Sequence, residues 1–171
     1  IPLRLVGSEM CIRDRAWTFT VEEDPELAAQ WRSLAQLPAG TLGAAVWQHY
    51  QSHSFTTPGE LGGANAALAH HDWLHVLGGY NVDVIGEVEN AAFGAGSSSA
   101  PGSTLWFLGV MAMFEGGLFD SVVAGCKPHQ ISAAGGPERV AHALRRGKPG
   151  ASRTDRDLSL IHISEPTRRR G

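Results

Sequence analysis

The adjacent glycines Gly78 and Gly79 are the feature that most constrains how this chain can fold. An alanine-rich segment with helical spacing of its apolar residues, 61–77, precedes them, and a second helical pattern begins near Asp83. Glycine adopts the left-handed conformations that end a helix more easily than other residues do. The pattern therefore predicts two helices that turn back on each other at this diglycine.

Four potential metal ligands flank that turn, with His71, Asp72 and His75 before it and Glu87 after it. On one helix the two histidines are a turn apart, and Asp72 lies about 100° around the axis from His71. Glu87 can join them only if the chain turns back, because twelve further helical residues would carry it about 18 Å away. Such a set suits zinc best, with iron or manganese as alternatives. Solvated histidines, or imidazolium at a helix C-terminus, remain the alternative.

Both ends of the chain look foreign to the rest of it. Residues 6–15 and 158–169 resemble translated sequencing-adapter sequence. We exclude such segments from fold reasoning, as one would a tag. We therefore expect three parts: an artefactual leader at 1–15, one natural helical domain at 16–157 and an artefactual tail at 158–171.

Charge is unevenly distributed in the natural part. Up to residue 126 it holds eleven acidic residues and a single basic one, Arg32, whereas 127–157 holds seven basic and three acidic residues. Nucleic acid is not an expected partner, because phosphate neutralisation needs a basic surface that most of the chain lacks. The basic part is typical of a solvated face or of a surface that meets anionic lipid. Cys126 is the one cysteine here, which fits a reducing compartment.

Helix signals dominate the sequence, and no window alternates β-branched with polar residues as a strand would. Asp24 before Pro25 is typical of a helix start, as is Thr41, and the capping-box-like segment 57–60 predicts the start of the histidine-bearing helix. The sequence therefore predicts an all-α, single-domain bundle of about six helices, near 25–34, 42–51, 61–77, 83–93, 104–123 and 138–146.

The fifth of these helices is apolar on nearly all sides from 105 to 114. Its length raises the question of a membrane span, but Glu115 and Asp120 would each cost about 2.5–3.5 kcal/mol at a bilayer centre. We interpret it as the core helix of the bundle. Such a helix needs cover from its own domain, a second subunit or a lipid.

Four parts of the sequence form a recognisable set: Leu37-Pro38-x-Gly40-Thr41-Leu42-Gly43, His71-Asp72-x-x-His75-x11-Glu87 after Gly86, the apolar helix, and Arg145-Arg146-Gly147. Together these motifs resemble the coenzyme Q biosynthesis protein 4 family. The resemblance covers about residues 37–148, and its most specific part matches both residue types and spacing. It implies an all-helical homodimer in which the four ligand candidates bind zinc and act catalytically through it.

The same resemblance implies a role in ubiquinone biosynthesis at a membrane surface. It would be peripheral on the inner membrane, on the cytoplasmic side in a bacterium or the matrix side in a mitochondrion. The protein would bind a prenylated aromatic quinone precursor, and either take part in its oxidative decarboxylation at ring carbon one or organise the other enzymes of the pathway. A weaker hypothesis assigns the isoprenoid tail to Trp106, Phe107, Val110 and Phe114.

Two other functions stay open at this point. One is a non-catalytic, lipid-binding scaffold in which a structural zinc pins two helices; four protein ligands would favour it, whereas three ligands and an open position favour catalysis. The other is an HD-type metal phosphohydrolase, which needs a further upstream histidine and a downstream aspartate. His49 or His53 and Asp120 are the candidates, and no spacing supports them.

Overall fold

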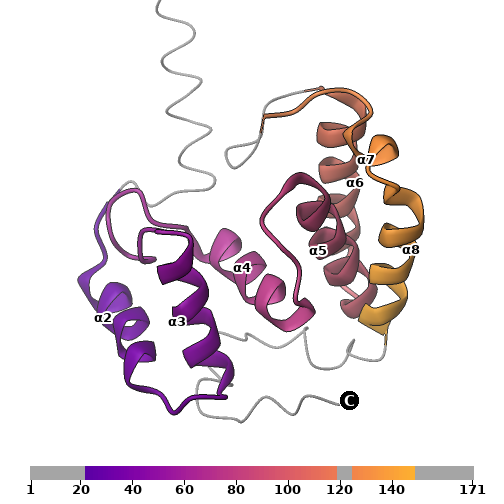
Figure 1. The fold of residues 1–171 in the computed structure, drawn as a ribbon. Helices are drawn as coiled ribbons and strands as arrows, with labels where there is room; N and C mark the ends of the chain where they lie inside the picture. The colour runs from indigo at the N-terminus through magenta and orange to yellow at the C-terminus, as the bar shows by residue number, and fades with distance from the viewer. Residues whose placement is uncertain (1–21, 119–124, 149–171) are drawn as a thin grey trace, which may run out of the picture. The chain divides into compact units, whose positions relative to one another are not determined.

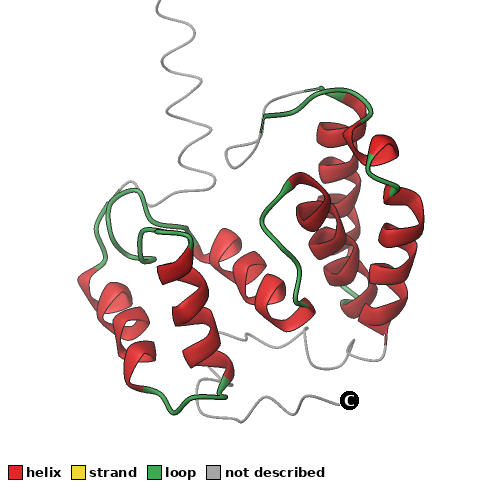
Figure 2. Ribbon diagram, in the orientation of Figure 1, coloured by secondary structure: helices red, strands yellow, loops and turns green. Residues whose placement is uncertain are grey.

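The structure, a computed structural model, describes residues 22–118 and 125–148 (Figure 1). Within these ranges the chain forms seven α-helices and one short 3-10 helix, without a strand (Figure 2). The predicted all-α class is therefore confirmed. Both adapter-like ends lie outside the described residues, as does Asp120.

The described chain divides into two compact units, and the division falls inside helix α4 (Ala66–Gly78), between Asp72 and Trp73. The first unit contains α2 (Pro25–Ser33), η1 (Leu34–Gln36), α3 (Leu42–Ser52) and the start of α4. The second contains the end of α4 and the helices α5 (Val84–Ser97), α6 (Pro101–Gly116), α7 (Gln130–Ala133) and α8 (Gly136–Gly147).

Capping starts the first two helices where the sequence predicts. The Asp24 carboxylate accepts from the Leu27 N–H at 3.0 Å, and the Thr41 hydroxyl accepts from the Ala44 N–H at 3.3 Å. Each satisfies a backbone donor that a helix start leaves without an intrahelical partner. Aromatic packing then joins α2 to α3, since the rings of Trp31 and Tyr50 lie 5.1 Å apart between centroids.

The predicted start of the histidine-bearing helix is wrong: α4 begins at Ala66 rather than near residue 61. Gly59 and Gly62 lie in the left-handed region, with φ of 89° and 80°, which a helix cannot continue through. At Gly63 a Cβ atom would also lie only 2.9 Å from the Thr57 carbonyl carbon. The segment is therefore a tight turn, and the Asn65 side chain accepts from the Leu68 N–H at 3.1 Å at the helix start.

In the second unit α5 packs against both α6 and α8, and their apolar faces form one core (Figure 1). Burial of this apolar surface is the main force that holds the helices together. α7 is a single turn that the sequence analysis did not predict, and it packs against the same core. The buried core residues are Ile85, Val88, Ala91, Ala92, Val110, Phe114, Ile131, Val140 and Ala143.

Helix α5 is longer than predicted, because its glycines allow it to pack closely against α8. It runs to Ser97 through a glycine-rich segment that we expected to be a loop from residue 94. A Cβ atom at Gly96 would meet the Leu144 carbonyl, and one at Gly147 would lie 2.8 Å from the Ser97 nitrogen. The glycines thus let the backbones of α5 and α8 approach closely.

Helix α6 is shorter than predicted. It starts at Pro101, in the first turn where proline is well tolerated, and stops at Gly117, which has a φ of 61°. It is a core helix on one face only. Val110 and Phe114 are buried, whereas Leu105 and Trp106 are 68% and 48% exposed. No helix in the described part of the chain has the length and apolar character that a membrane span needs.

Candidate metal centre

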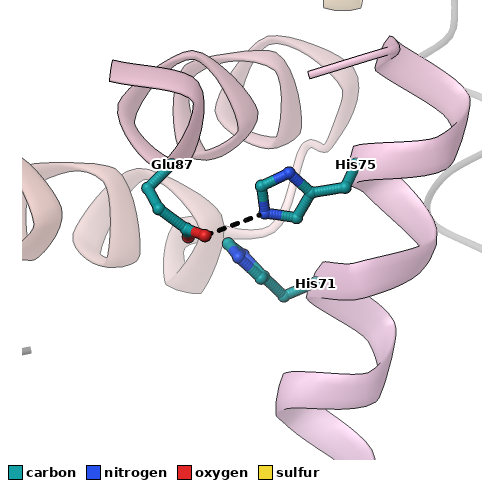
Figure 3. A group of neighbouring side chains, drawn as sticks. All are labelled: His71, His75 and Glu87. Carbon is teal, nitrogen blue, oxygen red and sulfur yellow. Dashed lines mark ion pairs between the residues drawn. The ribbon is translucent and has the colours of Figure 1, made fainter. Parts of the chain in front are cut away.

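Three of the predicted ligands come together in the structure. Potential ligand atoms of His71, His75 and Glu87 all lie within 4.8 Å of one another (Figure 3). Their exposed fractions are 8%, 1% and 7%, so the group is buried. The two histidines are one turn apart on α4, a continuous helix that fixes their spacing, and Glu87 extends from α5.

The diglycine turn brings Glu87 back to the histidines, as predicted. Gly79, with a φ of 70°, ends α4 and donates its N–H to the His75 carbonyl at 2.8 Å. Asp83 then caps α5, because its carboxylate accepts from the Gly86 N–H at 2.8 Å. A Cβ atom on Gly86 would collide with the Asn81 carbonyl, so glycine allows this tight return. Glu87 therefore lies in the first turn of α5.

The backbone of the turn also orients His75. Its Nδ1 lies 3.2 Å from the Tyr80 carbonyl oxygen. A carbonyl oxygen only accepts, so Nδ1 carries a proton, and Nε2 is the nitrogen that can bind a metal ion. That Nε2 is 3.3 Å from Glu87 Oε1. A metal-ligating histidine commonly has such a hydrogen bond at its other nitrogen, because the bond fixes the tautomer and the ring orientation.

Asp72, which the sequence predicts to be a metal ligand, contacts a residue of another helix. It is buried, and its Oδ2 accepts a hydrogen bond of 2.5 Å from the hydroxyl of Tyr50 on α3. Burial and the nearby Asp72 carboxylate raise the pKa of Tyr50 above its usual value, so the phenol stays protonated and can donate. Asp72 is not one of the three clustered residues. Its assignment as a ligand remains a prediction.

One distance within the three-residue group matches the spacing of ligands around a divalent cation, and all its potential ligand atoms lie within 4.8 Å of one another. Tetrahedral zinc with bonds of about 2.0–2.2 Å holds its ligand atoms roughly 3.3–3.6 Å apart. The 3.3 Å between His75 Nε2 and Glu87 Oε1 is in that range. A buried carboxylate also needs compensation for its lost hydration, which a cation provides. His71, His75 and Glu87 could therefore hold a metal ion, and the donor set itself does not select the metal.

The other candidates lie elsewhere. His49 and His53 belong to a ring cluster with Phe55, with centroids 4.5 Å apart between the two histidines, and they are not part of the three-residue group. His129 and His142 are exposed. The HD-type hypothesis also needs Asp120, which lies outside the described residues.

Sequence analysis missed two residues beside the site, Tyr50 and Tyr80. Tyr50 is 22 residues before Asp72 in the sequence, and no local pattern links them. Tyr80 acts through its backbone carbonyl, which any residue type supplies. The one signal available for Tyr80 was its position in the sequence. It follows the diglycine directly, two residues after the end of α4.

Comparisons with protein-family models, with curated proteins and with solved structures match this chain to none of them. The metal centre therefore rests on geometry, and the family resemblance rests on the motifs that carry it.

Proposed function

We propose that this chain is a metal-binding protein of ubiquinone biosynthesis that holds the polar head of a prenylated aromatic precursor at a zinc ion. One observation carries the proposal: three buried ligands, His71, His75 and Glu87, converge from two helices. The resemblance of the surrounding motif to the coenzyme Q biosynthesis protein 4 family supplies the pathway.

A three-ligand site leaves a coordination position for a further ligand, as catalytic zinc sites do and closed structural sites do not. Asp72 is not among the three clustered residues, which supports three ligands over four. A carboxylate or ring oxygen of the precursor suits the open position. Bound zinc would supply Lewis-acid polarisation of that oxygen.

The choice of metal separates the two proposed roles. Oxidative decarboxylation needs an electron acceptor, and zinc is redox-inert. With zinc, we propose that the site positions the precursor and that the protein organises its delivery to other enzymes of the pathway. With iron or manganese and oxygen, the same open position would serve catalysis of decarboxylation at ring carbon one.

The apolar face of α6 is our candidate for the isoprenoid tail and for contact with a membrane surface. Trp106 is 48% exposed and therefore accessible to an apolar ligand, whereas Phe107 is half-buried and packs partly against the core. Val110 and Phe114 belong to the core, and we assign them to packing. Each buried CH₂ contributes about 0.8 kcal/mol, so a long tail would supply much of the binding free energy.

Elemental analysis of the purified chain tests the metal site. We expect about one metal per chain in the wild type and its loss in His75→Ala and Glu87→Ala, because each removes a ligand. His142→Ala, at an exposed histidine of α8, is the matched control and should keep the metal. A wild-type protein that binds no divalent metal would refute the proposal.

Native mass spectrometry of the same preparations tests the ligand. We expect a prenylated aromatic acid or phenol to co-purify with the wild type and to be depleted in Glu87→Ala. Retention of such a lipid without any bound metal would mean that the metal does not hold the polar head.

A further inference from the structure

We propose that Arg146 is a positioning residue for the metal site, acting through Tyr80 on the imidazole of His75. It holds the Tyr80 ring in the turn after α4, and the Tyr80 carbonyl in turn fixes the His75 ring. The inference rests on the proposed metal binding, and every residue in it belongs to the second unit. It gives a role to the Arg-Arg-Gly motif that ends α8.

The first link joins the imidazole to the turn. His75 Nδ1 donates to the Tyr80 carbonyl over 3.2 Å, while His75 Nε2 faces Glu87 over 3.3 Å. The carbonyl thus sets which nitrogen is available to a metal and where it points. A displacement of residue 80 would rotate the ring of His75 away from Glu87.

The second link holds residue 80 in place. Arg146 Nη1 donates to the Tyr80 hydroxyl at 2.9 Å, and its guanidinium carbon lies 5.2 Å from the centre of the same ring. Phe93 of α5 packs at 5.9 Å between ring centroids. Gly78 lies directly against the Tyr80 ring, where a Cβ atom would collide with it. The ring is therefore held by contacts from α4, α5 and α8.

The third link fixes the base of Arg146. The next residue, Gly147, approaches the backbone of α5 so closely that a Cβ atom would meet the Phe93 carbonyl and lie 2.8 Å from the Ser97 nitrogen. Glycine is needed for this approach. This close approach holds the last turn of α8 against α5, so the Arg146 side chain extends from a fixed backbone.

The chain supplies two matched controls on the same helix. Arg145 has the same charge, lies in the same last turn and is exposed, but points about 100° away around the helix. Arg139 forms two hydrogen bonds of 3.0 and 2.7 Å with Glu89 of α5, so it links α8 to α5 through a partner other than Tyr80. Arg139→Met therefore shows how much a purely structural link between α8 and α5 contributes to the stability of the fold.

The experiment compares Arg146→Met, Arg145→Met and Arg139→Met in the full chain. Zinc affinity is measured by competition with a chelator, and the proton on His75 Nδ1 is followed by NMR of ¹⁵N-labelled histidine. Arg146→Met should lose roughly 10- to 100-fold in zinc affinity, as changes around a metal ligand do, and should alter the His75 signal. Arg145→Met should do neither, and Arg139→Met should lower the melting temperature without changing zinc affinity.

Two outcomes would overturn the inference. One is a zinc affinity and a His75 signal in Arg146→Met equal to those of Arg145→Met, even with reduced stability. The other is an equal loss of affinity in Arg139→Met. If the wild type binds no zinc, the proposed function fails, but the His75 signal of the metal-free protein still shows whether Arg146 positions the ring. If Arg146→Met does not fold, Tyr80→Phe, which removes the same hydrogen bond, replaces it.

Discussion

The hydroxyl of Tyr50 donates a 2.5 Å hydrogen bond to the carboxylate of Asp72, the residue after His71 of the three-residue group. Both residues are nearly inaccessible to solvent, at 2% and 7% exposed. A buried carboxylate needs such a donor, because it has lost the hydrogen bonds of water. The pair therefore links α3 to α4 beside the three-residue group.

Replacing Tyr50 by phenylalanine should destabilise the fold. The change leaves a buried carboxylate oxygen without this donor, and a hydrogen bond to a charged group contributes about 1.5–3 kcal/mol. Unfolding in urea, monitored by circular dichroism, measures the difference in free energy. Phe55→Leu, in the same ring cluster but without a hydrogen bond to Asp72, is a control for altered packing. A change below about 0.5 kcal/mol in Tyr50→Phe, within the usual range for surface substitutions, would contradict the role given to the pair.

Replacing Asp72 by asparagine should leave metal binding largely intact. The amide keeps an oxygen that can accept from Tyr50, and the three clustered ligands are unchanged. We expect a decrease of at most roughly 100-fold in affinity, the range for residues around a site rather than in it. The visible spectrum of the cobalt-substituted protein should stay the same. A changed spectrum, or a loss as complete as in His75→Ala, would make Asp72 a fourth ligand and favour the structural-zinc scaffold.

Local patterns predicted the parts of this structure that depend on local chemistry. The caps at Asp24 and Thr41 and the turn at Gly79 follow from side-chain and backbone preferences within a few residues. The convergence of His75 and Glu87 followed from helix geometry and one turn. These are the features that short-range physics decides.

Other boundaries depended on tertiary contacts and were wrong for that reason. Gly94 and Gly96 are typical of a loop, yet both lie within α5, and at Gly96 the backbone of Leu144 on α8 comes too close for a side chain. The Tyr50–Asp72 and Tyr80–Arg146 pairs are 22 and 66 residues apart in sequence. One sequence gives no signal for pairs at that distance.

Acid should weaken the contact between α6 and α7 through Glu115. Hydrogen bonds from the side chain and backbone of Ser132, with a further one from His129, lower the pKa of Glu115 from 4.5 to about 2. A carboxylate whose pKa is lower in the folded than in the unfolded chain stabilises the fold at any pH above the unfolded pKa. This contribution disappears as the pH falls from about 4.5 towards 2.

The stability difference between the wild type and Glu115→Gln tests this directly. The wild type should be the more stable at pH 7, and the difference should shrink as the pH falls through that window. Carboxyl ¹³C chemical shifts of the wild type should show Glu115 titrating well below 4.5. A constant difference from pH 7 to 3, or an ordinary titration of Glu115, would contradict the role of these hydrogen bonds.

Alanine at Gly147 should destabilise the second unit, whereas alanine at Gly109 should not. A Cβ atom at Gly147 would press on the backbone of α5, and forced overpacking costs about 1–3 kcal/mol. At Gly109, in the middle of α6, nothing lies within 4 Å of the added atom, so the higher helix propensity of alanine should stabilise by about 0.5–1 kcal/mol. Thermal unfolding of both variants gives the comparison. Because the chemical change is the same and only the surroundings differ, a stabilised Gly147→Ala would show that α5 and α8 do not approach as closely as the structure has them.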